Sequence, residues 1–118
     1  MISKKLKSLP PTQRDKRRYL VFRILSKNDF TLKQTTEAIN KALKDFIGTL
    51  GVAGSGTRII TKRWSQKTQT GIIMVNNKYL NELKASLTLI SKINNKTATI
   101  QSRGVSGILK KTKRFLEE

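Results

Sequence analysis

Two segments of this sequence, residues 19–26 and 69–76, are apolar on both faces of an extended chain. Side chains of a strand point alternately to opposite faces, so each segment has apolar residues for two different layers. In the first segment the two sets are Leu20, Phe22 and Ile24, and Tyr19, Val21 and Leu25. Strands of this kind lie inside a sheet that is covered on both sides. The two segments therefore predict two central strands, and the rest of the fold has to be arranged around them.

The elements between and after these strands follow a regular order. Thr31 and Gln34 form a capping-box signature ahead of apolar residues at helical spacing. The expected elements, in chain order, are a strand over 19–26, a helix from Thr31 to about Gly51, strands over 57–64 and 69–76, a helix from Asn76 or Asn77 to about Asn94, a strand over 96–103 and a helix over 106–116.

This order predicts an α+β fold, a ferredoxin-like (RRM-like) βαββαβ sandwich with a four-stranded antiparallel sheet and an extra C-terminal helix. Its first and third strands occupy the middle of the sheet, as their two apolar faces require. Two helices cover one face only, so we expect the C-terminal helix, together with a partner protein, to cover the other. We expect residues 19–118 to form a single domain after a basic, flexible tail over residues 1–18.

The charge of the chain indicates its partner. Among 118 residues, 25 are Lys or Arg and 7 are Asp or Glu, which gives a formal net charge of +18. Such a field favours a polyanion, and nucleic acid is the leading candidate, since no apolar run is long enough to span a membrane. The chain has no cysteine and no histidine, which removes thiolate and imidazole metal ligands and the commonest general base. We expect no catalytic residue, no metal site and a cytoplasmic protein.

The densest basic stretch near the C-terminus is Arg103–Arg114. We interpret it as a tight Gly-x-x-Gly turn, Gly104 to Gly107, that leads into a short helix capped by Ser106. The free N–H groups of a helix start attract anions. The basic side chains of this stretch are Arg103, Lys110, Lys111, Lys113 and Arg114, and the expected apolar stripe is Val105, Ile108, Leu109, Thr112 and Phe115. A solvated lysine-rich helix is the alternative interpretation.

Residues 1–18 carry seven basic side chains against the single acid Asp15. Pro10-Pro11 prevents a continuous helix, so this segment should be mobile until it meets an anionic surface, or else serve only as a solubilising tail.

Two other features are considered as binding sites, the side chain of Trp64 and a Gly-rich loop. Trp64 could stack on a base, but packing back over the sheet is the commoner outcome. The Gly-rich loop 51–56 lacks the Lys-Ser/Thr pair of a phosphate loop.

Two known activities of proteins with this fold, RNA binding on the sheet and catalysis, can be compared with the residues of this chain. RRM modules stack single-stranded RNA on aromatic residues of the two central strands, but the strand over 69–76 contains none. The acids are scattered and form no pair suited to acid/base or metal chemistry, and no site like that of the acylphosphatases is evident. The residues therefore predict a protein that binds RNA through its edges, tail and terminal helix.

Two motifs carry a resemblance to a known family. Leu9-Pro10-Pro11-Thr12 followed by Arg14–Tyr19, and Gly104–Gly107 with Lys110-Lys111, resemble the archaeal ribonuclease P protein component 2 family, which has a eukaryotic counterpart in the RNase P and MRP particles. The resemblance covers roughly residues 9–116. Gln13 interrupts the first motif without changing its basic character.

The resemblance implies a non-catalytic subunit of the ribonucleoprotein that removes 5′ leaders from precursor tRNA. It implies that the RNA holds Mg²⁺ and that the protein binds no cofactor. The implied partners are the catalytic domain of RNase P RNA, a larger barrel-shaped protein subunit, a second copy of the chain within a heterotetramer and, indirectly, precursor tRNA. Carried over by position, the RNA-binding residues are Arg14, Lys16, Arg17, Arg18, Arg103, Gly104, Ser106, Gly107, Lys110, Lys111, Lys113 and Arg114. The alternative is a general RNA-binding structural protein of the ribosomal or nucleic-acid-coating type, with no role in cleavage.

Overall fold

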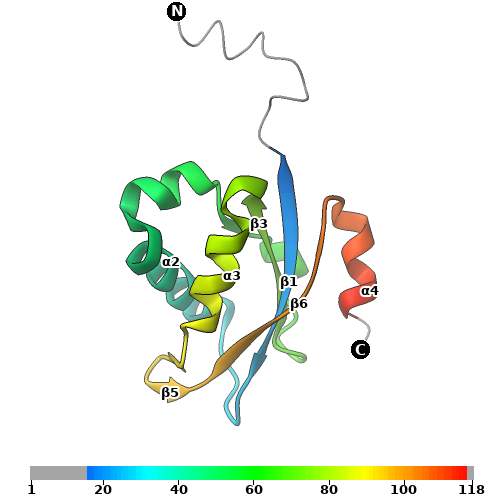
Figure 1. Ribbon diagram of the computed structural model, residues 1–118. Helices are drawn as coiled ribbons and strands as arrows, with labels where there is room; N and C mark the ends of the chain where they lie inside the picture. Colours follow the sequence, from blue (N-terminus) through cyan, green and yellow to red (C-terminus); the bar gives the residue numbers. More distant parts are fainter. Residues whose placement is uncertain (1–15, 117–118) are drawn as a thin grey trace, which may run out of the picture.

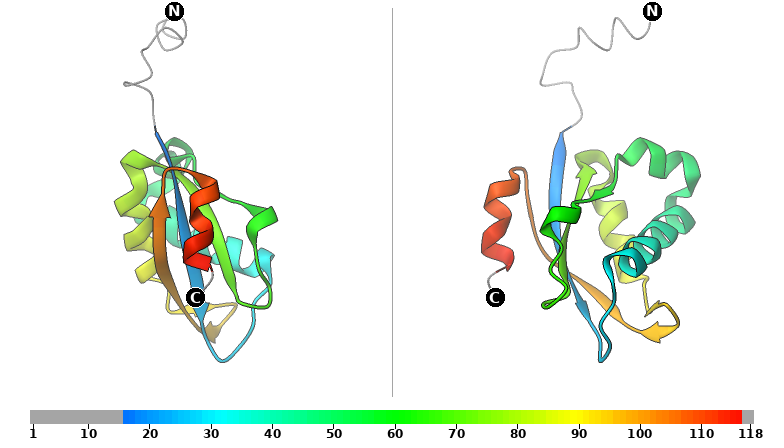
Figure 2. Two further views of the ribbon diagram at one scale, coloured as in Figure 1. Left: turned by 90° about the vertical axis from the view of Figure 1, so that its right-hand side faces the viewer. Right: turned by 180° about the vertical axis from the view of Figure 1, so that it is seen from behind.

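The computed structural model describes residues 16–116 and contains a four-stranded antiparallel sheet in the order β2-β3-β1-β6. Helices α2 and α3 cover one face, and the C-terminal segment lies against the other (Figures 1 and 2). The ferredoxin-like arrangement predicted from the sequence is therefore confirmed. The main elements are β1 Arg17–Leu25, α2 Leu32–Ser55, β2 Arg58–Ile59, β3 Thr70–Asn76, α3 Leu80–Thr88, β4 Lys92–Ile93, β5 Lys96–Thr97, β6 Thr99–Ser106 and α4 Lys113–Leu116, the last preceded by a 3₁₀ turn, Leu109–Thr112.

The two strands that are apolar on both faces, β1 and β3, occupy the centre of the sheet as predicted. Val21 pairs with Ile72 and Leu20 with Ile73, so each pair points to a different layer. All four side chains are completely buried. Burial on both faces explains why these segments contain so few polar residues.

Helix α2 begins with the predicted capping box and runs further than predicted. The Thr31 hydroxyl accepts a hydrogen bond from the Gln34 N–H at 3.2 Å, and the Gln34 amide oxygen accepts one from the Thr31 N–H at 3.0 Å. We expected a loop at residues 51–55, but they are helical. The chain kinks at Gly48, where φ is +79°, and the helix then resumes and continues to Ser55. The helix ends at Gly56 in a left-handed conformation, which glycine adopts without strain.

The second strand is much shorter than the predicted 57–64. Beyond Ile59 the chain forms a 3₁₀ turn, Thr61–Arg63, which brings Trp64 back onto the core. The Trp64 ring lies 6.3 Å from that of Phe22, centroid to centroid, and its Nε1–H donates to the Gln66 side-chain oxygen at 3.0 Å. Trp64 is thus half-buried in the core, the commoner of the two outcomes foreseen.

The segment after α3 also differs from prediction. The helix ends at Thr88, and residues 92–97 form a small hairpin, β4 and β5, instead of the last turns of a helix. Asn94 and Asn95 both have positive φ, +51° and +64°, which is the backbone of a two-residue hairpin turn that favours asparagine. The hairpin buries Ile93 against the core and delivers the chain to the edge strand β6.

Candidate nucleic-acid interface

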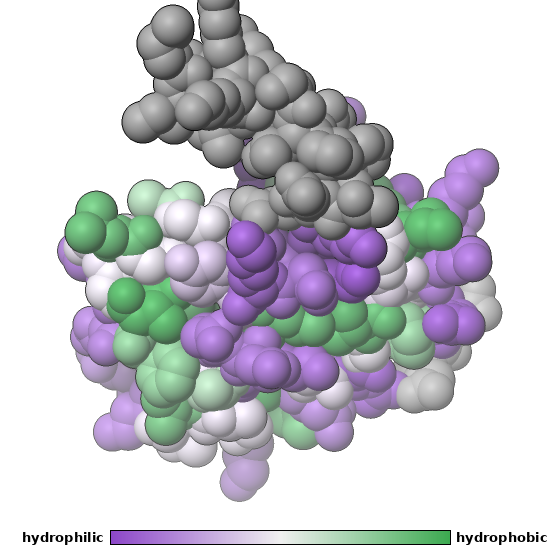
Figure 3. All heavy atoms as spheres, turned by 45° about the horizontal axis from the view of Figure 1, so that its top comes forward, coloured by the Kyte–Doolittle hydropathy of each residue, from purple (hydrophilic) through white to green (hydrophobic). Residues whose placement is uncertain are grey.

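The pairing of β1 with β6 brings the two basic motifs together. Tyr19 lies opposite Ser106, and Val21 lies opposite Gly104, so the start of β1 and the end of β6 share one end of the sheet. The Arg18 guanidinium rests against Gly107: a Cβ built on that glycine would lie 3.3 Å from Arg18 Nη1. Motifs almost ninety residues apart in the chain therefore form one surface, where hydrophilic side chains gather beside the point at which the chain enters the sheet (Figure 3).

The Gly-x-x-Gly segment is not the tight turn that we predicted. Gly104 and Ser106 belong to β6, because hydrogen bonding to β1 keeps the chain extended through residue 106. The Ser106 hydroxyl accepts from the Ile108 N–H at 3.1 Å and donates to the Ile108 carbonyl at 3.0 Å. The helical segment starts at Leu109, and Ile108, at its cap, has no side-chain oxygen to offer. The expected helix over 106–116 and the anion site at its start are therefore wrong.

The C-terminal segment does cover the open face of the sheet, as we expected. Phe115 lies directly on Gly104, where an added Cβ would overlap the ring. Thr112 is fully buried beneath the turn, with its hydroxyl donating to the Leu109 carbonyl at 2.5 Å. The predicted apolar stripe is only partly correct, because Ile108 is 52% exposed and Val105 packs on the opposite, helix-covered face. Glycine at 104 is needed here for close approach of the ring, not for turn geometry.

The other side of this segment is basic. Lys110, Lys111, Lys113 and Arg114 are all exposed, while Phe115 is half-buried against the sheet. The Arg114 guanidinium carbon lies 4.9 Å from the centroid of the Phe115 ring, close enough for a cation–π contact. One side thus packs on the protein and the other presents four cations to solvent, the division of roles that the sequence predicted.

Of the remaining basic residues, Lys16 and Arg17 lie at the same end, and Arg103 lies further along β6, opposite the middle of β1. Arg103 is the extra residue where β6 shifts register against β1, and its Nη1 donates to the Gln101 side-chain oxygen at 3.2 Å. Such bulges re-aim side chains at the edge of a sheet. Lys16 and Arg17 are exposed, and Arg14 lies outside the described residues. Sequence reasoning missed Arg58, which β2 places opposite Met74 beside this end of β3; only the strand register could have revealed it.

The described residues contain no group of three or more acidic, histidine or cysteine side chains that could hold a metal ion. Within the same part of the chain, none of the helices is both long enough and apolar enough to cross a membrane. The arrangement at this end of the sheet offers positive charge, backbone and a few polar side chains. These groups suit the binding of phosphates.

Comparison with known proteins identifies relatives of the whole chain. The model of the Rpp14/Pop5 family matches residues 18–117. Ribonuclease P protein component 2 of Pyrococcus furiosus is 41% identical over 118 residues, with 99% of this chain and 97% of that protein covered. The protein of the same name from Methanocaldococcus jannaschii is 32% identical, with 92% and 78% covered.

The fold has a counterpart among solved structures. A chain of the yeast ribonuclease MRP structure, determined by electron cryo-microscopy, superposes with a TM-score of 0.64 at 15% identity, covering 80% of this chain and 76% of that one. At this identity the likeness concerns the fold. The family match over residues 18–117 and the relative from Pyrococcus furiosus, which is aligned over almost its whole length, agree with it, and the chain belongs to the Rpp14/Pop5 family.

Proposed function

We propose that this chain binds the RNA of ribonuclease P through the basic end of its sheet and its C-terminal segment, and thereby supports removal of the 5′ leader from precursor tRNA. Its close relatives are ribonuclease P protein components, and the chain is a non-catalytic protein subunit of that ribonuclease. The observation that carries the RNA-binding role is the convergence of the two basic motifs on paired strands, with Arg18 against Gly107.

The physical reason for such a subunit is electrostatic. Folding a catalytic RNA brings phosphates close together, and their repulsion opposes the active structure. A protein of net charge +18 lowers that repulsion, while contacts held on rigid strands select one arrangement of the RNA. The proposed phosphate contacts are Arg14, Lys16, Arg17, Arg18, Arg103, Lys110, Lys111, Lys113 and Arg114, with Gly107 allowing close approach of the backbone. Gly104 lies beneath Phe115 and Ser106 is buried, so neither serves this purpose.

The proposal extends to partners and location. We expect the chain to work in the cytoplasm with the catalytic domain of the RNA and a larger barrel-shaped protein subunit, and to pair with a second copy of itself within a heterotetramer. Precursor tRNA would be affected indirectly. We expect Mg²⁺ to be held by the RNA. The half-exposed Phe46 and the exposed Leu89, which border one hollow on the helix-covered side, leave apolar surface for a protein partner away from the basic end.

The test is cleavage of precursor tRNA by archaeal RNase P RNA plus the barrel-shaped subunit, with and without this chain, at modest Mg²⁺. The chain should raise the cleavage rate, and changing Lys110, Lys111, Lys113 and Arg114 to Ala should abolish most of the gain. Changing four exposed lysines elsewhere, Lys27, Lys33, Lys67 and Lys96, removes the same charge and serves as the control.

A general RNA-coating protein makes a different prediction in this assay. It would bind RNA with a similar salt dependence but give no gain in cleavage. Equal loss in the two quadruple variants would mean that net charge alone matters, and would contradict the assignment of the RNA contact to the C-terminal segment.

A further inference from the structure

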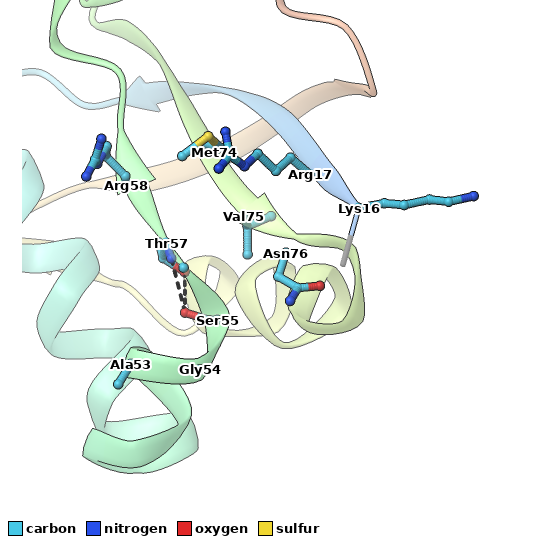
Figure 4. A pocket seen from close by; sticks show the side chains of 11 residues that line it. Lys16, Arg17, Ala53, Gly54, Ser55, Thr57, Arg58, Met74, Val75 and Asn76 are labelled. Atoms are coloured by element: carbon cyan, nitrogen blue, oxygen red, sulfur yellow. Dashed lines mark hydrogen bonds between the residues drawn. The ribbon is translucent and has the colours of Figure 1, made fainter. Parts of the chain in front are cut away.

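A hollow lies at the end of the sheet where α2 ends and β1 begins. It has a volume of about 510 Å³ and is bounded by the last turn of α2, the start of β1 and the ends of β2 and β3 (Figure 4). Its size is typical of pockets that enclose a small molecule or one unit of a polymer. The hollow exists because the β2–β3 ladder ends at Arg58 opposite Met74, whereas β3 continues to Asn76.

Three cations from two separate segments line this hollow, Lys16, Arg17 and Arg58, and no acidic side chain is among its lining residues. Register places Arg17 opposite Asn76 and Arg58 opposite Met74, so both arginines rise from the same face of the sheet on either side of β3. Arg17 extends over β3 towards Met74, while Lys16 points outward at the rim (Figure 4).

The floor of the hollow combines apolar and polar groups. Met74 is half-buried on the same face as the two arginines, so its thioether offers a soft apolar contact to a flat ring. The Asn76 side-chain oxygen accepts from the Lys78 N–H at 3.0 Å, which fixes the amide and leaves its NH₂ group as a donor. These are the groups that bind a base and its edge, beside arginines that bind phosphate.

One feature opposes anion binding. Helix α2 ends at Gly56 beside the hollow, and a helix C-terminus carries a partial negative charge equivalent to about half an elementary charge. The three full positive charges of Lys16, Arg17 and Arg58 outweigh this partial negative charge. The Ser55 hydroxyl already donates to the Val52 carbonyl at 2.7 Å, so one carbonyl of the helix end has a partner. The balance favours an anion on the arginine side, near Met74, and not directly on the helix end.

We infer that this hollow binds one nucleotide of an unpaired RNA strand, with its phosphate between Arg17 and Arg58 and its base against Met74, within reach of the Asn76 amide. A duplex presents phosphates on a convex surface that can touch the rim but cannot enter a recess, whereas an unpaired nucleotide can be inserted. The inference rests on the proposed function only in taking RNA as the ligand. It adds a second RNA contact, separate from the C-terminal segment, that includes a residue the sequence motifs do not contain.

The test compares Arg58→Ala with Lys44→Ala, which removes one charge from an exposed position on α2 that does not line the hollow. Binding of a fluorescent oligouridylate to the full chain is measured by polarisation over a series of salt concentrations. Arg58→Ala should weaken binding about tenfold and reduce the salt slope by about 0.7, the loss of one phosphate contact to a single strand. Lys44→Ala should change the affinity less than about twofold, as should Arg58→Ala for a blunt-ended, fully paired RNA duplex.

Further measurements separate the alternatives. Oligouridylate should shift the amide NMR signals of Thr57 and Asn76, which line the hollow. Equal effects of Arg58→Ala and Lys44→Ala, or an equal loss for the paired duplex, would overturn the inference. So would saturation of the hollow by adenosine monophosphate at concentrations where oligouridylate binds, because the ligand would then be a free nucleotide.

The outcome for this hollow is distinguishable from that of the proposed function. If the chain stimulates cleavage but Arg58→Ala behaves as Lys44→Ala does, the inference fails and the proposed function stands. If Arg58→Ala weakens oligouridylate binding but the chain gives no gain in cleavage, the hollow binds unpaired RNA and the proposed function fails. Comparing the effect of Arg58→Ala on cleavage of precursors with long and short 5′ leaders tells whether the unpaired strand in the hollow belongs to the substrate or to the catalytic RNA.

Discussion

Replacing Gly104 with Ala tests how the C-terminal segment is held on the sheet. The added Cβ would overlap Phe115 Cδ1 and lie 2.5 Å from Cε1, so either the sheet or the ring has to move. Overpacking of this kind costs about 1–3 kcal/mol. Undocking of the half-buried ring sets an upper limit, since about 100 Å² of lost apolar burial corresponds to about 2.5 kcal/mol. We therefore expect Gly104→Ala to lower the free energy of unfolding by about 1–2.5 kcal/mol.

The measurement is urea unfolding of the full chain, followed by Trp64 fluorescence, which reports from the other face of the sheet. Gly107→Ala is the matched control: its Cβ would meet only the flexible end of Arg18, at 3.3 Å, and should change stability by less than about 0.5 kcal/mol. In the background of Phe115→Ala, the Gly104→Ala change should cost much less, because the clash is gone. A Gly104→Ala variant as stable as the wild type, or a cost that is unchanged without the ring, would refute this account of the packing.

Three further results follow from the same structure. Thr31→Ala should destabilise the chain by about 1 kcal/mol, since it removes the cap that Gln34 completes; thermal unfolding measures this, and no change would mean that the cap is redundant. Gln69→Ala should cost about 2–3 kcal/mol in urea unfolding, because the buried Phe30 N–H, now bonded to the Gln69 oxygen at 2.8 Å, would lose its partner. If the basic end and the C-terminal segment neutralise about five phosphates, log affinity should fall with log salt at a slope of about −3.5 to −4.5; a flat response would contradict phosphate binding.

Much of the fold was predictable because the signals are local or periodic. Apolar residues on both faces of β1 and β3 required central strands, and the Thr31–Gln34 capping box marked the start of α2. The errors lie where tertiary contacts override a local pattern. The second helix seemed to continue to Asn94, but the positive φ of Asn94 and Asn95 turns the chain into a hairpin that buries Ile93. Helical spacing alone does not separate these outcomes.

The candidate site was predictable in composition but not in geometry. The exposed cations of the C-terminal segment were identified from charge and spacing, and the structure shows them exposed while Phe115 packs on the sheet. The glycines, however, were assigned to a turn. Gly104 lies in a strand, because its pairing partner Val21 is more than eighty residues away and leaves no local trace.

The sequence alone determined the fold class, the positive field and the RNA-directed chemistry, because alternation, capping and charge are properties of neighbouring residues. The tertiary structure decided which basic residues act together. Arg18 meets Gly107, and Arg17 and Arg58 flank Met74, only because antiparallel registers align positions distant in the chain. Register is set by burial of whole strand faces, a cooperative property that no single motif carries. The charge of the proposed RNA-binding surface is therefore evident in the sequence, but its location depends on the packing of the sheet.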